Sequence, residues 1–256
     1  MKRVVDESSP EPGVPVGGRT PEGEERAAPE RVTGRGRIPL LERIQAHERT
    51  SAFIAAADEF LGAQGFTEHG FRHANLVGHI AFNVLTHLGH DAHTAELGAA
   101  AGYLHDIGNV VSRAGHGQSS AWLAFDLLKE LEAAPADMAQ ILSAVGNHEE
   151  QYGEAVGPVA AAVILADKSD VHRSRVRKDA SIEMDIHDRV NHAVEASFLR
   201  VDTDQRTLTL ELTIDTAISH VLEYFEIFME RMIMCRRAGR TLGCDFKITV
   251  NDVQVL

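Results

Sequence analysis

A histidine and an aspartate occur side by side at the end of an apolar, alanine-rich run. His105 and Asp106 follow residues 99–104, and Gly108 comes two residues after the pair. Where a helix ends at such a pair, the imidazole can bind one metal ion while the two carboxylate oxygens bridge to a second ion. His-Asp pairs also occur by chance or as surface and capping pairs. Whether this pair binds metal therefore depends on which other potential ligands the fold could bring close to it.

Side chains with the same metal-binding chemistry occur in four other segments. They are His73, His116, His148 and Asp167. Imidazole nitrogen and carboxylate oxygen without thiolate suit iron, manganese, cobalt or zinc better than a structural zinc site built from cysteines. Six ligands are enough for two ions, and we predict that Asp106 is the catalytic residue shared by both. A hydroxide between the ions would be a nucleophile at neutral pH, because metals lower the pKa of bound water to about 7.

Two of these histidines, together with His69, have local surroundings that leave other roles open. His116 and His148 lie near predicted loops, where an exposed histidine with no ligand role is the alternative. His69 precedes His73 by one helical turn and could form an i,i+4 metal pair with it. Because Gly70 follows His69, however, we expect His69 to lie in a loop and to be exposed to solvent.

Helical periodicity from residue 39 onward predicts the scaffold that positions these side chains. Apolar residues recur at helical spacing, and Pro135 and Pro158 suit the first turns of two helices. The predicted helices span residues 40–62 with a break near residue 50, 71–88, 94–105, 119–131, 135–148, and 158–168 with an extension beyond. Short connections between successive helices are typical of a helical bundle. We assign residues 39–185 to this bundle.

The pattern changes near residue 186. Residues 198–201 and 207–214 alternate apolar and polar side chains, which predicts a β-hairpin. A long amphipathic helix over residues 217–237 and a last strand over 246–250 would complete a small α+β module, residues 186–256. The predicted fold is mainly α, with the bundle followed by this module. Free strand edges could pair with a second copy, so we predict a possible homodimer through the module.

Composition limits the other classes of function. Residues 1–38 contain five of the eight prolines and almost no large apolar side chains, which predicts a disordered segment. The net charge of −13 argues against a nucleic acid or an anionic membrane as a partner. Cys235 and Cys244 have neither a metal-ligand spacing nor a disulfide framework. Because an apolar signal core and a long apolar run are also absent, we expect a cytoplasmic protein.

The order of the candidate ligands, H…HD…H…H…D, resembles that of the HD-domain metal-dependent phosphohydrolases over residues 71–177. RHANLV at 72–77 resembles the first-histidine segment, and LHDIG at 104–108 the motif that names the family. GHGQSS at 115–120 and VGNHE at 145–149 resemble the extra histidines of two-metal members, and LADK at 165–168 the closing aspartate. Asn109 departs from the family, because many members have lysine there. The resemblance implies an all-helical fold with the metals between helices.

Basic side chains near these ligands are candidates for contact with substrate phosphates. They are Arg72, Lys168, Arg173 and Arg177. Guanidinium groups match phosphate oxygens bidentately. If the helix that begins at Pro158 continues, Arg173 and Arg177 share one face about 9 to 15 Å beyond Asp167 along the axis. The alternative is a solvated helix end whose cations complement the helix dipole.

Together these features predict a metal-dependent phosphohydrolase that acts on a small phosphate ester or anhydride, with a nucleotide as the expected substrate. Two divalent transition-metal ions (Fe, Mn, Co or Zn) would be its cofactors. Two other classes remain open. A diiron HD-domain oxygenase resembling myo-inositol oxygenase would use a similar ligand set to activate dioxygen. A non-catalytic nucleotide-binding or interaction module would keep the fold without needing full metal occupancy.

Overall fold

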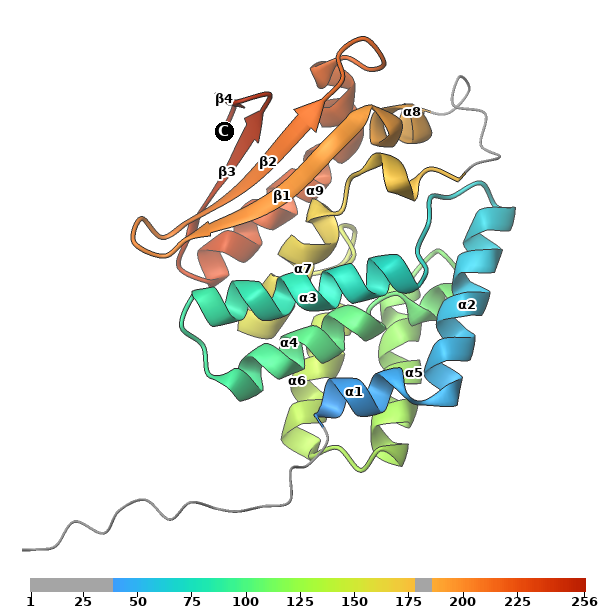
Figure 1. The fold of residues 1–256 in the computed structure, drawn as a ribbon. Helices are drawn as coiled ribbons and strands as arrows, with labels where there is room; N and C mark the ends of the chain where they lie inside the picture. The colour runs from blue at the N-terminus through green and yellow to red at the C-terminus, as the bar shows by residue number, and fades with distance from the viewer. Residues whose placement is uncertain (1–38, 178–185) are drawn as a thin grey trace, which may run out of the picture. The chain divides into compact units, whose positions relative to one another are not determined.

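The computed structural model describes residues 39–177 and 186–256. The predicted disordered segment, residues 1–38, lies outside the described residues. The described residues form one compact unit that is mainly helical, with a small four-stranded sheet near the C-terminus (Figure 1). The predicted fold class, mainly α followed by a small α+β module, is therefore confirmed.

The bundle follows the predicted helices closely. Its helices are α1 (Leu40–Gln45), α2 (Glu48–Ala63), α3 (Phe71–His87), α4 (Ala92–Leu104), α5 (His116–Glu130), α6 (Pro135–Gly146) and α7 (Pro158–Ser169). Two short 3-10 turns, η1 (Ile107–Val110) and η2 (Arg173–Arg175), follow α4 and α7. The break predicted near residue 50 lies earlier, because the backbone of His47 is extended and Thr50 is buried within α2.

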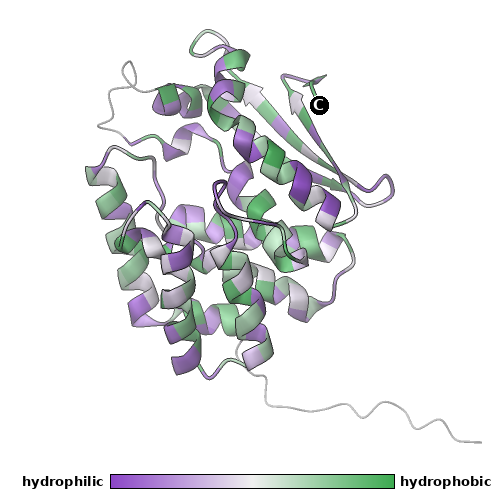
Figure 2. Ribbon diagram, turned by 180° about the vertical axis from the view of Figure 1, so that it is seen from behind, coloured by the Kyte–Doolittle hydropathy of each residue, from purple (hydrophilic) through white to green (hydrophobic). Residues whose placement is uncertain are grey.

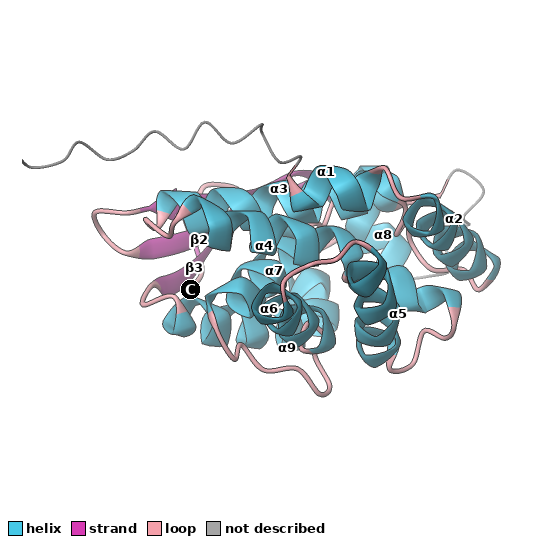
Figure 3. Cartoon of the chain, turned by 90° about the horizontal axis from the view of Figure 1, so that it is seen from below, coloured by secondary structure: helices cyan, strands magenta, loops and turns pink. Residues whose placement is uncertain are grey.

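The alanine- and glycine-rich helix α4 packs against α3, α6 and α7, and Figure 3 shows it between α3 and α7. Its small side chains allow close approach of the backbones. A Cβ on Gly102 would lie 3.0 Å from the Cα of Gly78, so any larger residue there would push α4 and α3 apart where they cross. This crossing brings the N-terminal half of α3 close to the C-terminal end of α4.

The C-terminal module forms a sheet with strand order β1-β2-β3-β4. Its elements are α8 (Ile186–Ala193), β1 (Val194–Asp202), β2 (Thr207–Ile214), α9 (Val221–Thr241), β3 (Asp245–Val250) and β4 (Val253–Gln254). β1 and β2 form the predicted antiparallel hairpin, whereas β2 and β3 are parallel. A parallel pair needs a crossover connection, and α9 provides it.

The register of the sheet places apolar side chains in rows that α9 covers. Leu210 pairs with Leu199 on one side and with Ile248 on the other, and Leu210 and Ile248 are buried. Seen from behind in Figure 2, α9 crosses in front of the sheet with hydrophilic and hydrophobic residues interspersed along it. α9 also packs on α7, and so connects the module to the bundle. None of the helices in the described ranges is long and apolar enough to cross a lipid bilayer.

Candidate metal centre

The structure brings the six predicted metal ligands together. His73 lies on α3, His105 and Asp106 follow α4, His116 begins α5, His148 follows α6, and Asp167 lies near the end of α7. All four histidines are buried, His116 with an exposed fraction of 5% being the most exposed of them. Neither His116 nor His148 is thus the exposed loop histidine that was the alternative for it.

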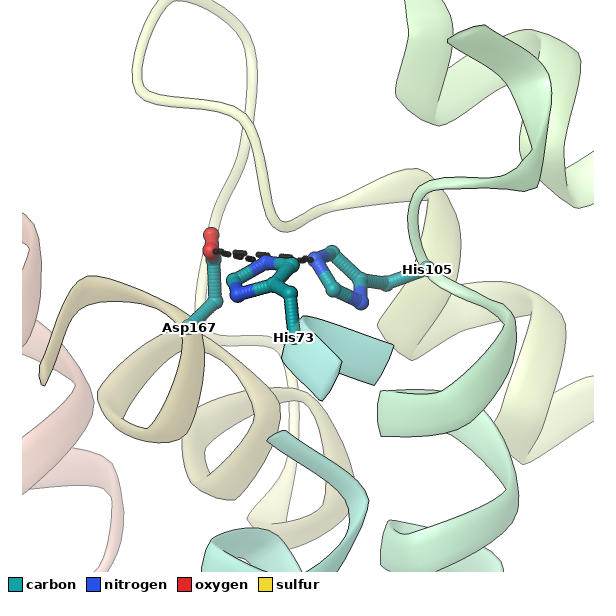
Figure 4. A group of neighbouring side chains, drawn as sticks. All are labelled: His73, His105 and Asp167. Carbon is teal, nitrogen blue, oxygen red and sulfur yellow. Dashed lines mark hydrogen bonds and ion pairs between the residues drawn. The ribbon is translucent and has the colours of Figure 1, made fainter. Parts of the chain in front are cut away.

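One group of ligands contains the first two histidines and the closing aspartate. The Nε2 atoms of His73 and His105 lie 3.2 Å apart. Asp167 Oδ1 lies 3.4 Å from His73 Nε2 and 3.7 Å from His105 Nε2. Figure 4 shows the three side chains pointing toward one another from α3, from the residue that follows α4, and from α7. Their ligand atoms are close enough together to hold one metal ion.

A second group contains the other two histidines. The Nε2 atoms of His116 and His148 lie 2.9 Å apart. Asp106 Oδ1 lies 3.1 Å from His116 Nε2 and 3.7 Å from His148 Nε2. The other oxygen, Asp106 Oδ2, lies 3.3 Å from His105 Nε2 in the first group. Asp106 thus presents one oxygen to each group.

The remaining ring nitrogens fix how each imidazole is protonated. Each Nδ1 faces an oxygen acceptor at 2.7 to 3.0 Å: Asp170 Oδ2 for His73, Gly102 O for His105, Arg113 O for His116 and Val145 O for His148. In neutral rings Nδ1 therefore carries the proton and donates it, and Nε2 carries only a lone pair. Four such lone pairs facing one another and two carboxylates repel each other unless cations lie between them. This orientation of histidine ligands is typical of metal sites.

The electrostatics of the cluster likewise favour positive charge within it. Burial acts to lower the pKa of His105, but the carboxylates of Asp106 and Asp167 raise that pKa to about 10. Burial acts to raise the pKa of Asp106, yet His105, His116 and His148 hold it well below its usual range. Burial lowers the pKa of His148. The carboxylates therefore stay ionised, and bound metal ions or protons must balance their charge.

Two acidic residues that were not predicted orient the histidines. Asp170 accepts the hydrogen bond from His73 Nδ1, and Glu149 Oε2 lies 3.2 Å from His116 Nδ1. The signal for both was their adjacency to predicted ligands, since Glu149 follows His148 directly and Asp170 lies three residues after Asp167. A carboxylate bonded to a ligand histidine fixes the ring and increases its basicity.

Two of the predicted substrate-contact residues lie beside the ligands in ion pairs. The buried Lys168 Nζ lies 2.7 Å from Asp167 Oδ2 and 2.9 Å from Glu150 Oε1. Lys168 therefore holds one oxygen of Asp167 while the other faces the histidines. The guanidinium of Arg72 lies 2.8 Å from Asp170 Oδ2 and also pairs with Glu68.

The predicted placement of the other two arginines is wrong. α7 ends at Ser169, so Arg173 and Arg177 do not share a helix face. Arg173 pairs with Glu195 at 2.9 Å. Arg177 pairs with Asp58 at 2.6 Å and donates to Phe66 O at 2.9 Å, which attaches its segment to the end of α2. The helix ends here because Asp170 leaves the helical conformation and binds His73 and Arg72.

The expected exposure of His69 is also wrong. Its exposed fraction is 8%, and its ring packs edge-on against the His73 ring with centroids 5.5 Å apart. His69 Nδ1 lies 2.6 Å from Thr67 O. Burial lowers the pKa of His69 well below its usual value, and the charge of Arg175 acts in the same direction. The i,i+4 spacing from His73 was the signal that pointed to this neighbour.

Comparison with known proteins gives little further information. No family model matches the chain. A similar protein is the uncharacterized protein MJ1020 of Methanocaldococcus jannaschii, which is 27% identical over 160 residues. The match covers 54% of this chain and 61% of the relative, so the chain spans less than two thirds of the relative's length. The geometry of the site is therefore the basis for the functional argument.

Proposed function

We propose that this protein is a two-metal hydrolase of a small phosphate ester or anhydride, with a nucleotide as the expected substrate. The observation that supports this most directly is the position of Asp106. Its two oxygens face two different groups of histidine Nε2 atoms, so each oxygen would contact a separate cation if both groups were occupied. Sharing of a carboxylate between two ions is common to two-metal hydrolytic sites.

The residues fit two divalent transition-metal ions. His73, His105, Asp167 and one oxygen of Asp106 would hold the first, and His116, His148 and the other oxygen of Asp106 would hold the second. Nitrogen and oxygen donors suit Fe, Mn, Co or Zn. When bound, such ions supply Lewis acidity, which lowers the pKa of a water nucleophile and offsets phosphoryl charge.

The protein's own residues prepare this site before substrate arrives. Asp170 and Glu149 fix the rings of His73 and His116, and Lys168 fixes Asp167. Burial of the cluster excludes bulk water, which strengthens the electrostatic interactions with a phosphoryl group. These positioning contacts reduce the reorganisation that the site needs during the reaction.

Membership of the HD-domain phosphohydrolases is part of this proposal. The support is that the residues of the pattern H…HD…H…H…D, which are spread over 95 positions of the sequence from His73 to Asp167, converge. Five of them form two groups that could hold a metal ion, and the Nε2 atom of the sixth, His116, lies 2.9 Å from that of His148. Asn109 replaces the lysine of many members. Its side-chain amide donates to Asp106 Oδ1 at 3.0 Å, so it contacts a candidate ligand instead of carrying a cation.

The test combines metal analysis with a phosphate-release screen. Protein purified without added metal, and then loaded, should contain about two ions per chain and release phosphate from a nucleotide under anaerobic conditions. His73→Ala and His148→Ala should each lower the metal content and abolish release. His79→Ala is the matched control, because His79 is an exposed histidine on the same helix as His73.

Different outcomes would support the other two classes. A requirement for dioxygen and a mixed-valent iron pair, with no phosphate released from any nucleotide, would assign the protein to the oxygenases. Nucleotide binding with neither metal nor turnover would assign it to the non-catalytic modules. A single ion that is unaffected by His148→Ala would reduce the centre to a mononuclear site.

A further inference from the structure

A pocket of about 210 Å³ contains a concentration of arginines in this otherwise acidic protein. We call it the arginine pocket and define it by Phe66, His69, Arg113, Arg175, Phe228 and Arg231. Phe66 and His69 come from the segment between α2 and α3, Arg113 from the segment before α5, and Arg175 from η2. Phe228 and Arg231 come from α9, so the C-terminal module forms one wall.

Two contacts place the arginine pocket beside the metal centre. His69, which lines the pocket, packs with its ring centroid 5.5 Å from that of the candidate ligand His73. Arg113 Nη1 donates to Asn109 Oδ1 at 3.3 Å, and the amide of Asn109 donates to Asp106 Oδ1 at 3.0 Å. One lining residue therefore contacts a candidate ligand directly, and another is linked to a candidate ligand through a single side chain, that of Asn109.

An ionic chain provides a third connection. Arg231 Nε lies 3.1 Å from Glu150 Oε1, and Lys168 Nζ lies 2.9 Å from the same oxygen. Lys168 in turn contacts Asp167 at 2.7 Å. The position of Arg231 on α9 is thus linked to that of a candidate metal ligand on α7.

The guanidinium groups are held in place but keep N–H donors for a ligand. Arg231 lies over the ring of Phe228 and Arg113 over the ring of Phe66, at 4.6 and 5.5 Å. A guanidinium has five N–H donors, and the contacts recorded within the described part of the chain use one on Arg113 and one on Arg231. Both groups can therefore bind an oxyanion without giving up these contacts.

Arginines outnumber carboxylates among the lining residues, and two of the arginines, Arg175 and Arg231, also pair with carboxylates outside the lining, Asp170 and Glu150. Arg175 is buried, and three of its N–H groups donate to the carbonyls of Glu68 and Asp170. Burial lowers the pKa of Arg175, although the carboxylate of Asp170 opposes the shift, and the charge of Arg231 adds to the lowering. Asp188 also lines the pocket, so three arginines face one lining carboxylate. An oxyanion in the pocket would accept hydrogen bonds from the N–H donors that remain on Arg113 and Arg231.

We propose that the arginine pocket binds a phosphate group adjacent to the one held by the metal centre, so that the substrate has at least two neighbouring phosphates. This inference rests on the proposed hydrolase function. Bidentate guanidinium groups match the oxygens of a tetrahedral oxyanion. Arg113 belongs to the helical bundle, whereas Arg231 belongs to α9 of the C-terminal module. Through Arg231, the module would therefore contribute to the choice of substrate.

The test compares two stable probes, methylphosphonate and methylenediphosphonate, by titration calorimetry on the metal-loaded protein. Methylphosphonate can occupy only one of the two places at a time, whereas the diphosphonate can occupy the metal centre and the pocket together, and its P–C–P bridge resists hydrolysis. The native protein should bind the diphosphonate at least about tenfold more tightly, because charge-assisted hydrogen bonds are added. Arg231→Gln and Arg113→Gln should each remove most of this preference while the metal content stays the same.

Arg236→Gln is the matched control, because Arg236 is exposed on α9 and does not line the pocket. It should keep the full preference. Equal affinity of the native protein for both probes, or an unchanged preference in both pocket variants, would overturn the proposal, and so would a failure of the diphosphonate to bind. A preference that depends on the arginines in a protein that hydrolyses no phosphate compound would support the pocket and contradict the proposed function alone.

Discussion

At the level of single residues, Asp106 is the one that contacts both groups of candidate metal ligands. Oδ2 lies 3.3 Å from His105 Nε2, and Oδ1 lies 3.1 Å from His116 Nε2. Asp106→Asn keeps the shape of the side chain but removes the negative charge that both ions would share. We expect loss of at least one ion per chain and a fall in phosphate release of more than about a hundredfold. Elemental analysis and kinetics on the same samples test this.

The control is Asp126→Asn, which removes an exposed carboxylate of α5 that pairs with Arg49. Metal content and turnover should not change. Two tightly bound ions in Asp106→Asn would show that the carboxylate does not bridge two sites.

Glu150 predicts a specific dependence of stability on pH. Burial acts to raise its pKa, but the charges of Lys168 and Arg231 lower that pKa to about 2, from an ordinary value of 4.5. The ionised carboxylate therefore stabilises the folded chain above pH 4.5, and this contribution is lost as the pH falls from 4.5 through 2. A shift of this size corresponds to about 3 kcal/mol at neutral pH. Urea unfolding of the metal-free protein at pH 7 and pH 3 measures it.

Glu150→Gln should be less stable than the native chain by about 3 kcal/mol at pH 7, and by clearly less at pH 3. Glu154→Gln is the control, because Glu154 is exposed and its nearest cation, Arg237, lies 3.9 Å away. If the free-energy difference between Glu150→Gln and the native chain were the same at both pH values, Glu150 would not be the titrating group.

The sequence predicts ligands better than their supporting residues. His73, His105 and Asp167 follow from residue type and order, because metal chemistry restricts both. Asp170 and Glu149 act through hydrogen bonds to Nδ1 atoms, and those depend on the path of the backbone after α6 and α7. The burial of His69 depends on packing of the segment before α3, which periodicity does not describe.

At the level of elements, the contact between η1 and the start of α5 determines whether the second group of ligands can form. A Cβ on Gly108 would lie 2.3 Å from both His116 O and Ser120 N. Gly108→Ala should push α5 away and move His116 from Asp106. We expect the metal content to fall from about two ions to one, and stability to fall by about 1 to 3 kcal/mol. Metal analysis and thermal unfolding measure both effects.

Gly146→Ala is the control for this substitution. A Cβ on Gly146 would lie 3.7 Å from the nearest atom, the Cβ of Ala121, which is an ordinary contact. Both ions should be retained, and stability should not fall. Retention of both ions in Gly108→Ala would mean that the position of α5 does not control the second site.

The hydrophobic periodicity of the sequence predicts the ends of a helix or strand correctly only where local sequence signals determine those ends. The start of α3 at Phe71 and both ends of β2 agree with the structure because their patterns begin and end at clear signals. The end of α7 depends instead on tertiary contacts of Asp170, which is why Arg173 and Arg177 were misplaced. The two-residue strand β4 exists only through its pairing with β3 and leaves no pattern of its own.

For the whole molecule, the important feature is that the bundle and the C-terminal module share one compact unit. α9 packs on α7, the helix that positions Asp167, and its Phe228, Met232 and Cys235 are buried. β1 packs against α3 and α7 as well. The module therefore supports the helices of the metal centre, and changes at the centre should affect it.

Metal removal tests this coupling. When the free metal concentration is a thousand times the dissociation constant, each site adds about 4 kcal/mol to the stability of the folded chain. For a unit of this size that corresponds to a rise in melting temperature of about 8 to 16 °C for each site. A chelator should therefore lower the melting temperature strongly, which circular dichroism measures.

Hydrogen exchange then shows which parts of the chain respond to metal removal. Just below the melting temperature of the metal-free protein, amides of α4 in the bundle and of β2 in the module should lose protection together, because α7 and α9 pack on each other. Amides that open together belong to one cooperative unit. Full protection of β2 after α4 has become unprotected would contradict this expectation, since it would mean that the module folds independently of the metal centre.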